Sequence, residues 1–278
     1  SYTPQCDIAA LRVMASGSLL LLMLVAPMAW AHSPLAGGGQ EQTAAMLSAL
    51  VLGLGWLVYL LGAWRARPAM LALAAFNLSM LLAFYAVLGP LDEWAETSTA
   101  WHMVQHMLFM VVIAPLFVLA RPLPQISAGG GRAASVIWNP LLRFTRHPML
   151  AAYLHGLVIW FWHVPRFYVL ALDNPWWHVI EHACFLVTAG LFWWAVLKSS
   201  SRAVHWALFA LLFTLMHTGF LGAMLTFAQA SLYGPDRSLQ DQQLAGLIMW
   251  VLGAFPYLLA SAWVGYRWYK QMQRQLNR

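Results

Sequence analysis

The chain of 278 residues is 62% hydrophobic and only 9% charged, with a formal net charge of +6. A soluble domain carries about 25% charged residues, so this composition excludes an ordinary water-soluble protein. The basic residues do not form a stripe interleaved with aromatic residues, which argues against a surface that binds nucleic acid. The two cysteines give neither a disulfide framework nor a Cys-x-x-Cys metal pair. Any metal site must therefore rely on histidine, methionine and carboxylate ligands.

The N-terminal segment differs from the rest of the chain. Residues 19–26 form a short apolar run, and residues 29–31, Ala-Trp-Ala, match the small-x-small pattern of signal peptidase sites. We interpret residues 1–31 as a signal peptide, with an uncleaved additional helix as the alternative. Residues 32–278 are then a single membrane domain.

Seven apolar segments follow, each close to the ~20 residues with which an α-helix crosses a bilayer. They are continuous rather than alternating, so they predict helices and not the strands of a β-barrel. The expected fold is an all-α integral membrane protein, a seven-transmembrane-helix bundle after the signal peptide. The longest connection, residues 121–148, contains three consecutive glycines and is interpreted as a flexible linker. The predicted spans cover about 44–64, 69–89, 100–120, 149–170, 176–197, 204–229 and 243–265.

Charged residues alternate between the connections. Arginine and lysine gather in residues 65–68, 121–148 and 198–203 and in the C-terminal tail, whereas acidic residues predominate in the other connections. Basic loops remain in the cytoplasm, so this pattern predicts a multi-pass membrane protein with its N-terminus outside and its C-terminus cytoplasmic. The net positive charge is then explained by topology and by contact with anionic membrane lipid.

Two histidine pairs have the i,i+4 spacing of one helix face, His102 with His106 and His178 with His182. In the expected topology both pairs lie in the outer leaflet, because their segments start from the outside and rise by ~1.5 Å per residue. A polar ring in hydrocarbon usually faces the bundle interior and has a function. We therefore expect the two pairs to converge.

Other residues can join this layer. His163 and His217 lie in the outer parts of their segments, whereas His155 lies nearer the cytoplasm and is more consistent with a structural hydrogen bond. Glu181 follows His178 by three residues, so it could bind a metal ion, orient a histidine or accept a proton. Neutral imidazole is a common ligand of transition metals, and nearby methionines add thioethers that suit Cu(I). The predicted metal site comprises His102, His106, His163, His178, Glu181, His182 and His217.

Long runs of the sequence are similar to one membrane family. They are WHMVQHMLFMVVIAPLFVLARPLP, TRHPMLAAYLHGLVIWFWHVPRFYVLAL, WWHVIEHACFLVTAGLFWW and LYGPDRSLQDQQLAGLIMWVLG. They resemble the CtaG-type assembly factors of bacterial caa-type cytochrome c oxidases, over about residues 45–265. The resemblance implies a non-enzymatic assembly factor of the bacterial inner membrane that has the oxidase subunits as partners and delivers copper received from a periplasmic donor. Residues 241–243, Asp-Gln-Gln, would lie at the outer mouth and attract the cation.

Other functions stay open on the sequence. Residues 178–182, HVIEH, match the H-x-x-E-H motif of zinc peptidases, in which two histidines bind zinc and the glutamate acts as a base. Histidines on facing helices could instead hold a b-type haem. A metal permease is less consistent, because the inner half of the bundle offers few polar groups besides His155. Copper handling is the favoured interpretation, with haem and zinc as alternative cofactors.

Overall fold

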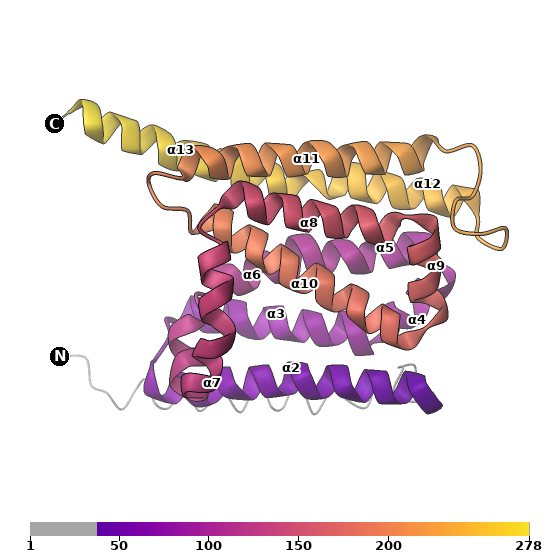
Figure 1. The fold of residues 1–278 in the computed structure, drawn as a ribbon, viewed down its shortest axis with the longest axis horizontal. Helices are drawn as coiled ribbons and strands as arrows, with labels where there is room; N and C mark the ends of the chain where they lie inside the picture. Colours follow the sequence, from indigo (N-terminus) through magenta and orange to yellow (C-terminus); the bar gives the residue numbers. More distant parts are fainter. Residues whose placement is uncertain (1–37, 278) are drawn as a thin grey trace.

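The structure, a computed structural model, describes residues 38–277, and these residues form helices and loops without a strand (Figure 1). The all-helical prediction is therefore confirmed for this part of the chain. The predicted signal peptide, residues 1–31, lies outside the described residues.

Six helical segments of the described chain are long and apolar enough to cross a membrane. Two of them contain a π-helical turn, which divides each into shorter helices. Thr99–Leu119 comprises α5 (Thr99–Met107), η2 (Leu108–Ile113) and α6 (Ala114–Leu119), and Leu239–Leu276 comprises α12 (Leu239–Leu247), η3 (Ile248–Leu252) and α13 (Ala254–Leu276). The other four are α2 (Gly39–Arg65), α3 (Met70–Leu88), α10 (Pro175–Leu197) and α11 (Val204–Phe227). The chain is thus a multi-pass membrane protein.

The fourth predicted span, 149–170, does not form one long helix. It contains α8 (Pro148–His163) of 16 residues and α9 (Pro165–Asp173) of 9 residues. The chain is extended at Val164, because a residue before proline disfavours the helical conformation. At ~1.5 Å per residue α8 is shorter than the ~30 Å hydrocarbon core, so the expected count of seven spanning helices is not confirmed.

The predicted linker at 121–148 is wrong. Residues Leu123–Phe144 form α7, which packs across α2 at one end of the bundle (Figure 1). A Cβ atom on Gly62 would overlap the backbone of α7, and one on Gly129 would overlap the backbone of α2. Gly62 and Gly129 therefore allow the two helices to touch. Gly131, with φ 56°, is the only non-helical residue within α7, and the helix is kinked there.

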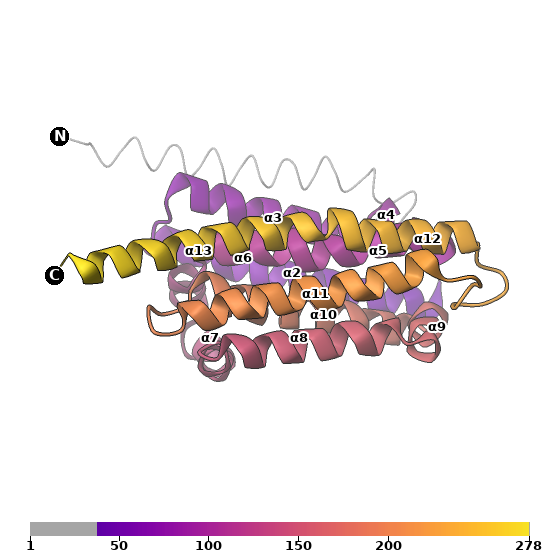
Figure 2. The ribbon, with the colours of Figure 1, turned by 90° about the horizontal axis from the view of Figure 1, so that it is seen from above.

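The two ends of the bundle differ in their connections. The short helix α4 (Pro90–Thr97), α9, the start of α2 and the connection 228–238 lie at one end, and α7 lies at the other (Figure 1). Seen from above, α11 runs between α8 and α13 (Figure 2). Acidic residues gather at the first end, which is called the acidic end below, and arginines gather at the second.

Candidate metal centre

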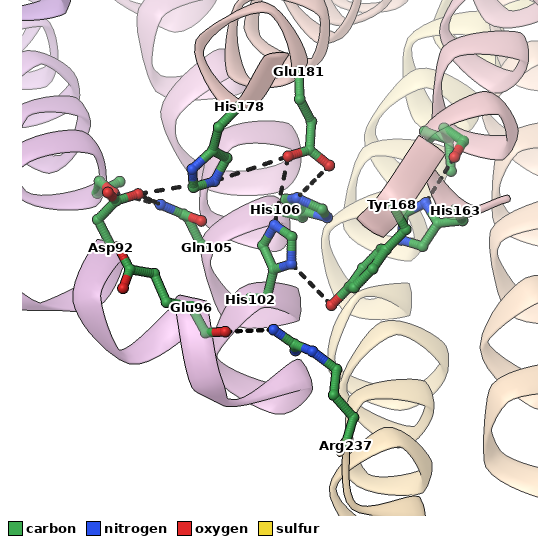
Figure 3. A network of polar contacts seen from close by, with 12 residues as sticks. Asp92, Glu96, His102, Gln105, His106, His163, Tyr168, His178, Glu181 and Arg237 are labelled. Carbon is green, nitrogen blue, oxygen red and sulfur yellow. Dashed lines mark hydrogen bonds and ion pairs between the residues drawn. The ribbon is translucent and has the colours of Figure 1, made fainter. Parts of the chain in front are cut away.

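Two helices that begin at the acidic end supply both histidine pairs. The hydroxyl of Ser98 caps α5 by accepting a hydrogen bond from the Trp101 amide at 3.2 Å. The side chain of Asn174 caps α10 by accepting from the Trp176 amide at 2.9 Å. Such caps fix where a helix starts. Each pair then begins three residues after the first helical residue, so the two pairs occupy equivalent turns of helices that face each other (Figure 3).

His102, His106 and Glu181, called the inner triad, meet in the interior of the bundle (Figure 3). The Nε2 atom of His102 lies 3.5 Å from one carboxylate oxygen of Glu181, and that of His106 lies 3.3 Å from the other. All three residues are fully buried. Their potential ligand atoms all lie within 4.8 Å of one another.

These facing atoms have no hydrogen-bond partner in the described structure. The Nε2 atoms of His102 and His106 and both carboxylate oxygens of Glu181 are buried without one. Such burial is costly unless another group satisfies the atoms. A proton on one imidazole can bridge a single nitrogen–oxygen pair, whereas one metal ion can bind all three groups. Ligands about 2.0–2.2 Å from one ion lie about 3–4 Å apart, which matches the two measured separations.

Asp92, His178 and His182, called the outer triad, lie beside the inner triad. The Nε2 atom of His178 is 3.9 Å from Asp92 Oδ1 and also 3.9 Å from Glu181 Oε2. Neither His178 nor His182 has a hydrogen-bond partner at Nε2. Gln105 donates hydrogen bonds from Nε2 to Asp92 Oδ1 at 2.7 Å and to the Ala86 carbonyl at 2.8 Å, and thereby orients the carboxylate.

A polar cleft of about 260 Å³ reaches the outer triad from the acidic end. Its walls carry the carboxylates of Glu41, Asp92, Glu96 and Asp173, and none of its lining residues is a lysine or arginine. Burial raises the pKa of the Asp92 and Glu96 carboxyls, and repulsion from Glu41 adds to both shifts, while His178 opposes them. A cation in this cleft would therefore stabilise the ionised carboxylates, for which the lining offers no lysine or arginine partner.

Aromatic side chains position the inner triad from the other side. The Nδ1 atom of His102 is 2.8 Å from the hydroxyl oxygen of Tyr168, which leaves Nε2 facing Glu181 (Figure 3). Tyr168 stacks on Tyr233 with ring centroids 3.7 Å apart, and the Tyr233 hydroxyl donates to the His163 carbonyl at 3.0 Å. Contacts of this kind fix the orientation of a metal-binding histidine.

A family model described as cytochrome c oxidase caa3 assembly factor (Caa3_CtaG) matches residues 57–271. This chain belongs to that family. The match covers more than half of the chain and includes both triads. No curated protein and no solved structure matches the chain.

The assembly factor brings together five of the predicted histidine and glutamate ligands, namely His102, His106, His178, Glu181 and His182. His163 adjoins them, because its ring centroid is 5.5 Å from that of His106, but its Nδ1 atom bonds the Ile159 carbonyl at 2.7 Å. His217 is in neither triad of the described structure. It accepts a hydrogen bond from Trp160 Nε1 at 3.3 Å, between α8 and α11.

Residues 241–243 lie at the start of α12, beside the start of α5, and none of them lines the acidic cleft. Asp241 accepts hydrogen bonds from the Ser98 hydroxyl and the Ala100 amide, so it stabilises the start of α5. Gln242 accepts from the Leu232 amide at 2.8 Å, and Gln243 donates to the Ala228 carbonyl at 3.1 Å. Residues 241–243 thus hold α5 and the connection 228–238 in place.

Sequence reasoning missed Asp92, Gln105, Tyr168 and Tyr233 as members of this centre. In the sequence, Asp92 is one of several acidic residues in a connection between apolar segments, and nothing there distinguishes it as a ligand. Tyr168 is 66 residues from His102 along the chain, and no local pattern links the two. A polar residue within an apolar segment, as at Gln105, is the one sequence signal that could have identified part of this network.

Proposed function

We propose that this assembly factor binds a copper ion at the inner triad and delivers it to cytochrome c oxidase. The main support is a buried group of two imidazole nitrogens and one carboxylate that have no hydrogen-bond partner and the spacing of ligands to one ion. Imidazole and carboxylate together suit Cu(II) and also zinc and iron. Copper is favoured because the resemblance to CtaG-type factors implies copper insertion into the oxidase.

The alternatives fit less well. In a zinc hydrolase the glutamate of HVIEH would act as a base, but the imidazole nitrogens nearest to Glu181 belong to His102 and His106, which favours a ligand role. A haem needs a larger and mainly apolar cavity, whereas the cleft lined by His178 and His182 measures about 260 Å³ and carries four carboxylates. Membership of an assembly-factor family also favours a role without catalysis.

The proposal includes an orientation. The acidic end would face the periplasm of a bacterial inner membrane, where a copper donor could reach it, and the arginine-rich end would face the cytoplasm and anionic lipid. The basic connection at 198–203 and the connection 228–238 should then lie on opposite sides. Reporter fusions after Arg202 and after Arg237 test this, and the same side for both would refute the orientation.

The function is tested by the double variant His106→Ala with Glu181→Gln. It removes one ligand and the only carboxylate of the inner triad, and it adds no bulk to the bundle. We expect purified protein to lose Cu(II) binding, measured by metal analysis and by nitrogen hyperfine structure in electron paramagnetic resonance. Cells should make the oxidase subunits in normal amounts but have low oxidase activity, and added copper should partly restore it.

The matched control is His155→Ala with His217→Ala, which also alters two membrane-embedded polar residues but spares both triads. It should retain copper binding and oxidase activity. If the triad variant binds copper normally and supports full oxidase activity, the proposed function is wrong.

A further inference from the structure

The outer triad differs from the inner triad in its access to solvent. The side chains of His178 and Asp92 are 13% and 10% exposed, whereas that of Glu181 is 0% exposed. His178 and His182 line the cleft at the acidic end, and no residue of the inner triad does. An ion from outside would therefore meet the outer triad first.

The outer triad also has the donors of a metal site. Its ligand atoms lie within 4.8 Å of one another. His182 is only 6% exposed, yet its Nε2 atom has no hydrogen-bond partner in the described structure, as is the case for His178. Unpartnered imidazoles beside a carboxylate distinguish this cleft from a merely acidic surface, because a neutral imidazole nitrogen is a metal ligand.

One residue connects the two triads. The Nε2 atom of His178 lies at the same distance, 3.9 Å, from Asp92 Oδ1 and from Glu181 Oε2. The rings of His178 and His102 are in edge contact, with centroids 5.6 Å apart. A small rotation of the His178 ring would therefore bring its free nitrogen closer to either carboxylate, and an ion could exchange one carboxylate ligand for the other without leaving the protein.

We propose that the outer triad is a separate loading site, which takes a divalent cation from the acidic cleft and passes it through His178 to the inner triad. This inference rests on the proposed function, since it supplies the route to the same inner site. The cleft concentrates cations, because its four carboxylates act together within low-dielectric walls. The inner triad then retains the ion, because its three donors are fully buried.

The inference is tested with full-length protein in detergent and Cu(II) ions, whose binding quenches tryptophan fluorescence in a stopped-flow experiment. Asp92→Asn keeps the shape of the side chain and removes its charge. We expect loading to slow by at least about tenfold, while the equilibrium affinity changes by less than about threefold. Glu93→Gln removes the same charge from the same short helix at a residue that does not line the cleft, and it should slow loading by less than about threefold.

A second variant, Glu41→Gln with Asp173→Asn, alters the walls of the cleft without touching either triad. Loading by this variant should be slower at low salt and less sensitive to ionic strength than loading by the wild type. A wild-type loading rate in Asp92→Asn would overturn the inference. A loss of Cu(II) affinity in Asp92→Asn as large as that in Glu181→Gln would also overturn it, because it would indicate a single site. If wild-type protein binds no Cu(II), the proposed function fails as well. If wild-type protein binds Cu(II) and the variants load it at the wild-type rate, only the loading site is refuted.

Discussion

The inner triad and the pair His155 and His217 are two groups of imidazoles within one bundle, and they differ in charge; His155 is buried and His217 is half-buried. In both groups the Nε2 atoms lack a hydrogen-bond partner in the described structure. The Thr188 hydroxyl donates to the Cys184 carbonyl, so it accepts from His155 Nδ1, and this leaves a lone pair on His155 Nε2. His217 Nδ1 accepts from Trp160, which leaves a proton on His217 Nε2.

The hydrogen bonds of His155 and His217 are therefore met by neutral tautomers, and neither residue forms a described ion pair with a carboxylate. The inner triad instead contains the carboxylate of Glu181, whose nearest described partners are the imidazoles of His102, His106 and His178, and no lysine or arginine forms a described ion pair with it. The comparison teaches that the number of buried histidines does not identify a metal site. A buried carboxylate among neutral imidazoles points to such a site, because burying a charge is far more costly than burying a neutral ring.

The largest effect should come from removing that charge. Glu181→Gln keeps the volume of the side chain, but we expect it to weaken Cu(II) binding by more than about 100-fold, because a ligand is lost and loss of an orienting partner alone typically costs 10–100-fold. Competition with a chelator of known affinity measures the effect.

His217→Ala is the comparison variant, and it should leave the Cu(II) dissociation constant within about twofold of the wild-type value, because only neutral hydrogen bonds are lost. Equal losses of affinity in Glu181→Gln and His217→Ala would break the distinction between the two groups. They would show that His217 belongs to the metal centre, as the sequence first suggested.

A smaller effect should come from Tyr168→Phe. The hydroxyl of Tyr168 is the partner of His102 Nδ1, so its removal should free the ring to rotate and weaken Cu(II) binding by about 10-fold, within the usual 10–100-fold range for such partners. Chelator competition again gives the affinity, and the nitrogen hyperfine pattern reports the altered ligand.

Tyr257→Phe is the matched control for Tyr168→Phe. Tyr257 is also fully buried and stacks on Trp193, but its hydroxyl has no hydrogen-bond partner in the described structure. Its removal should leave copper affinity unchanged. An equal loss in the two variants would attribute the effect to packing rather than to the orientation of His102.

Several features of the site could be predicted from the sequence because they depend on local spacing. Residues four apart on one helix point the same way, so the two rings of each histidine pair lie on one face. Both pairs begin three residues after the start of their helix, so they lie at the same depth. His217 satisfied the same depth argument but lies between α8 and α11, apart from the triads. The sequence position gives the depth of a residue along the bundle axis, but the direction in which its side chain points around that axis is set by helix packing.

The sequence alone determined that this protein lies in a membrane, that it is helical, and that its basic and acidic connections separate, because apolar length and charge are additive properties of the chain. The tertiary structure decided which polar atoms face one another. Asp92 contacts His178 from α4, and Tyr168 contacts His102 from α9, so each contact joins residues at least 66 positions apart and depends on how side chains pack across the bundle. The helix at residues 123–144 also depends on tertiary structure, because it packs against α2 at Gly62, and a contact between two separate segments cannot be read from either segment alone.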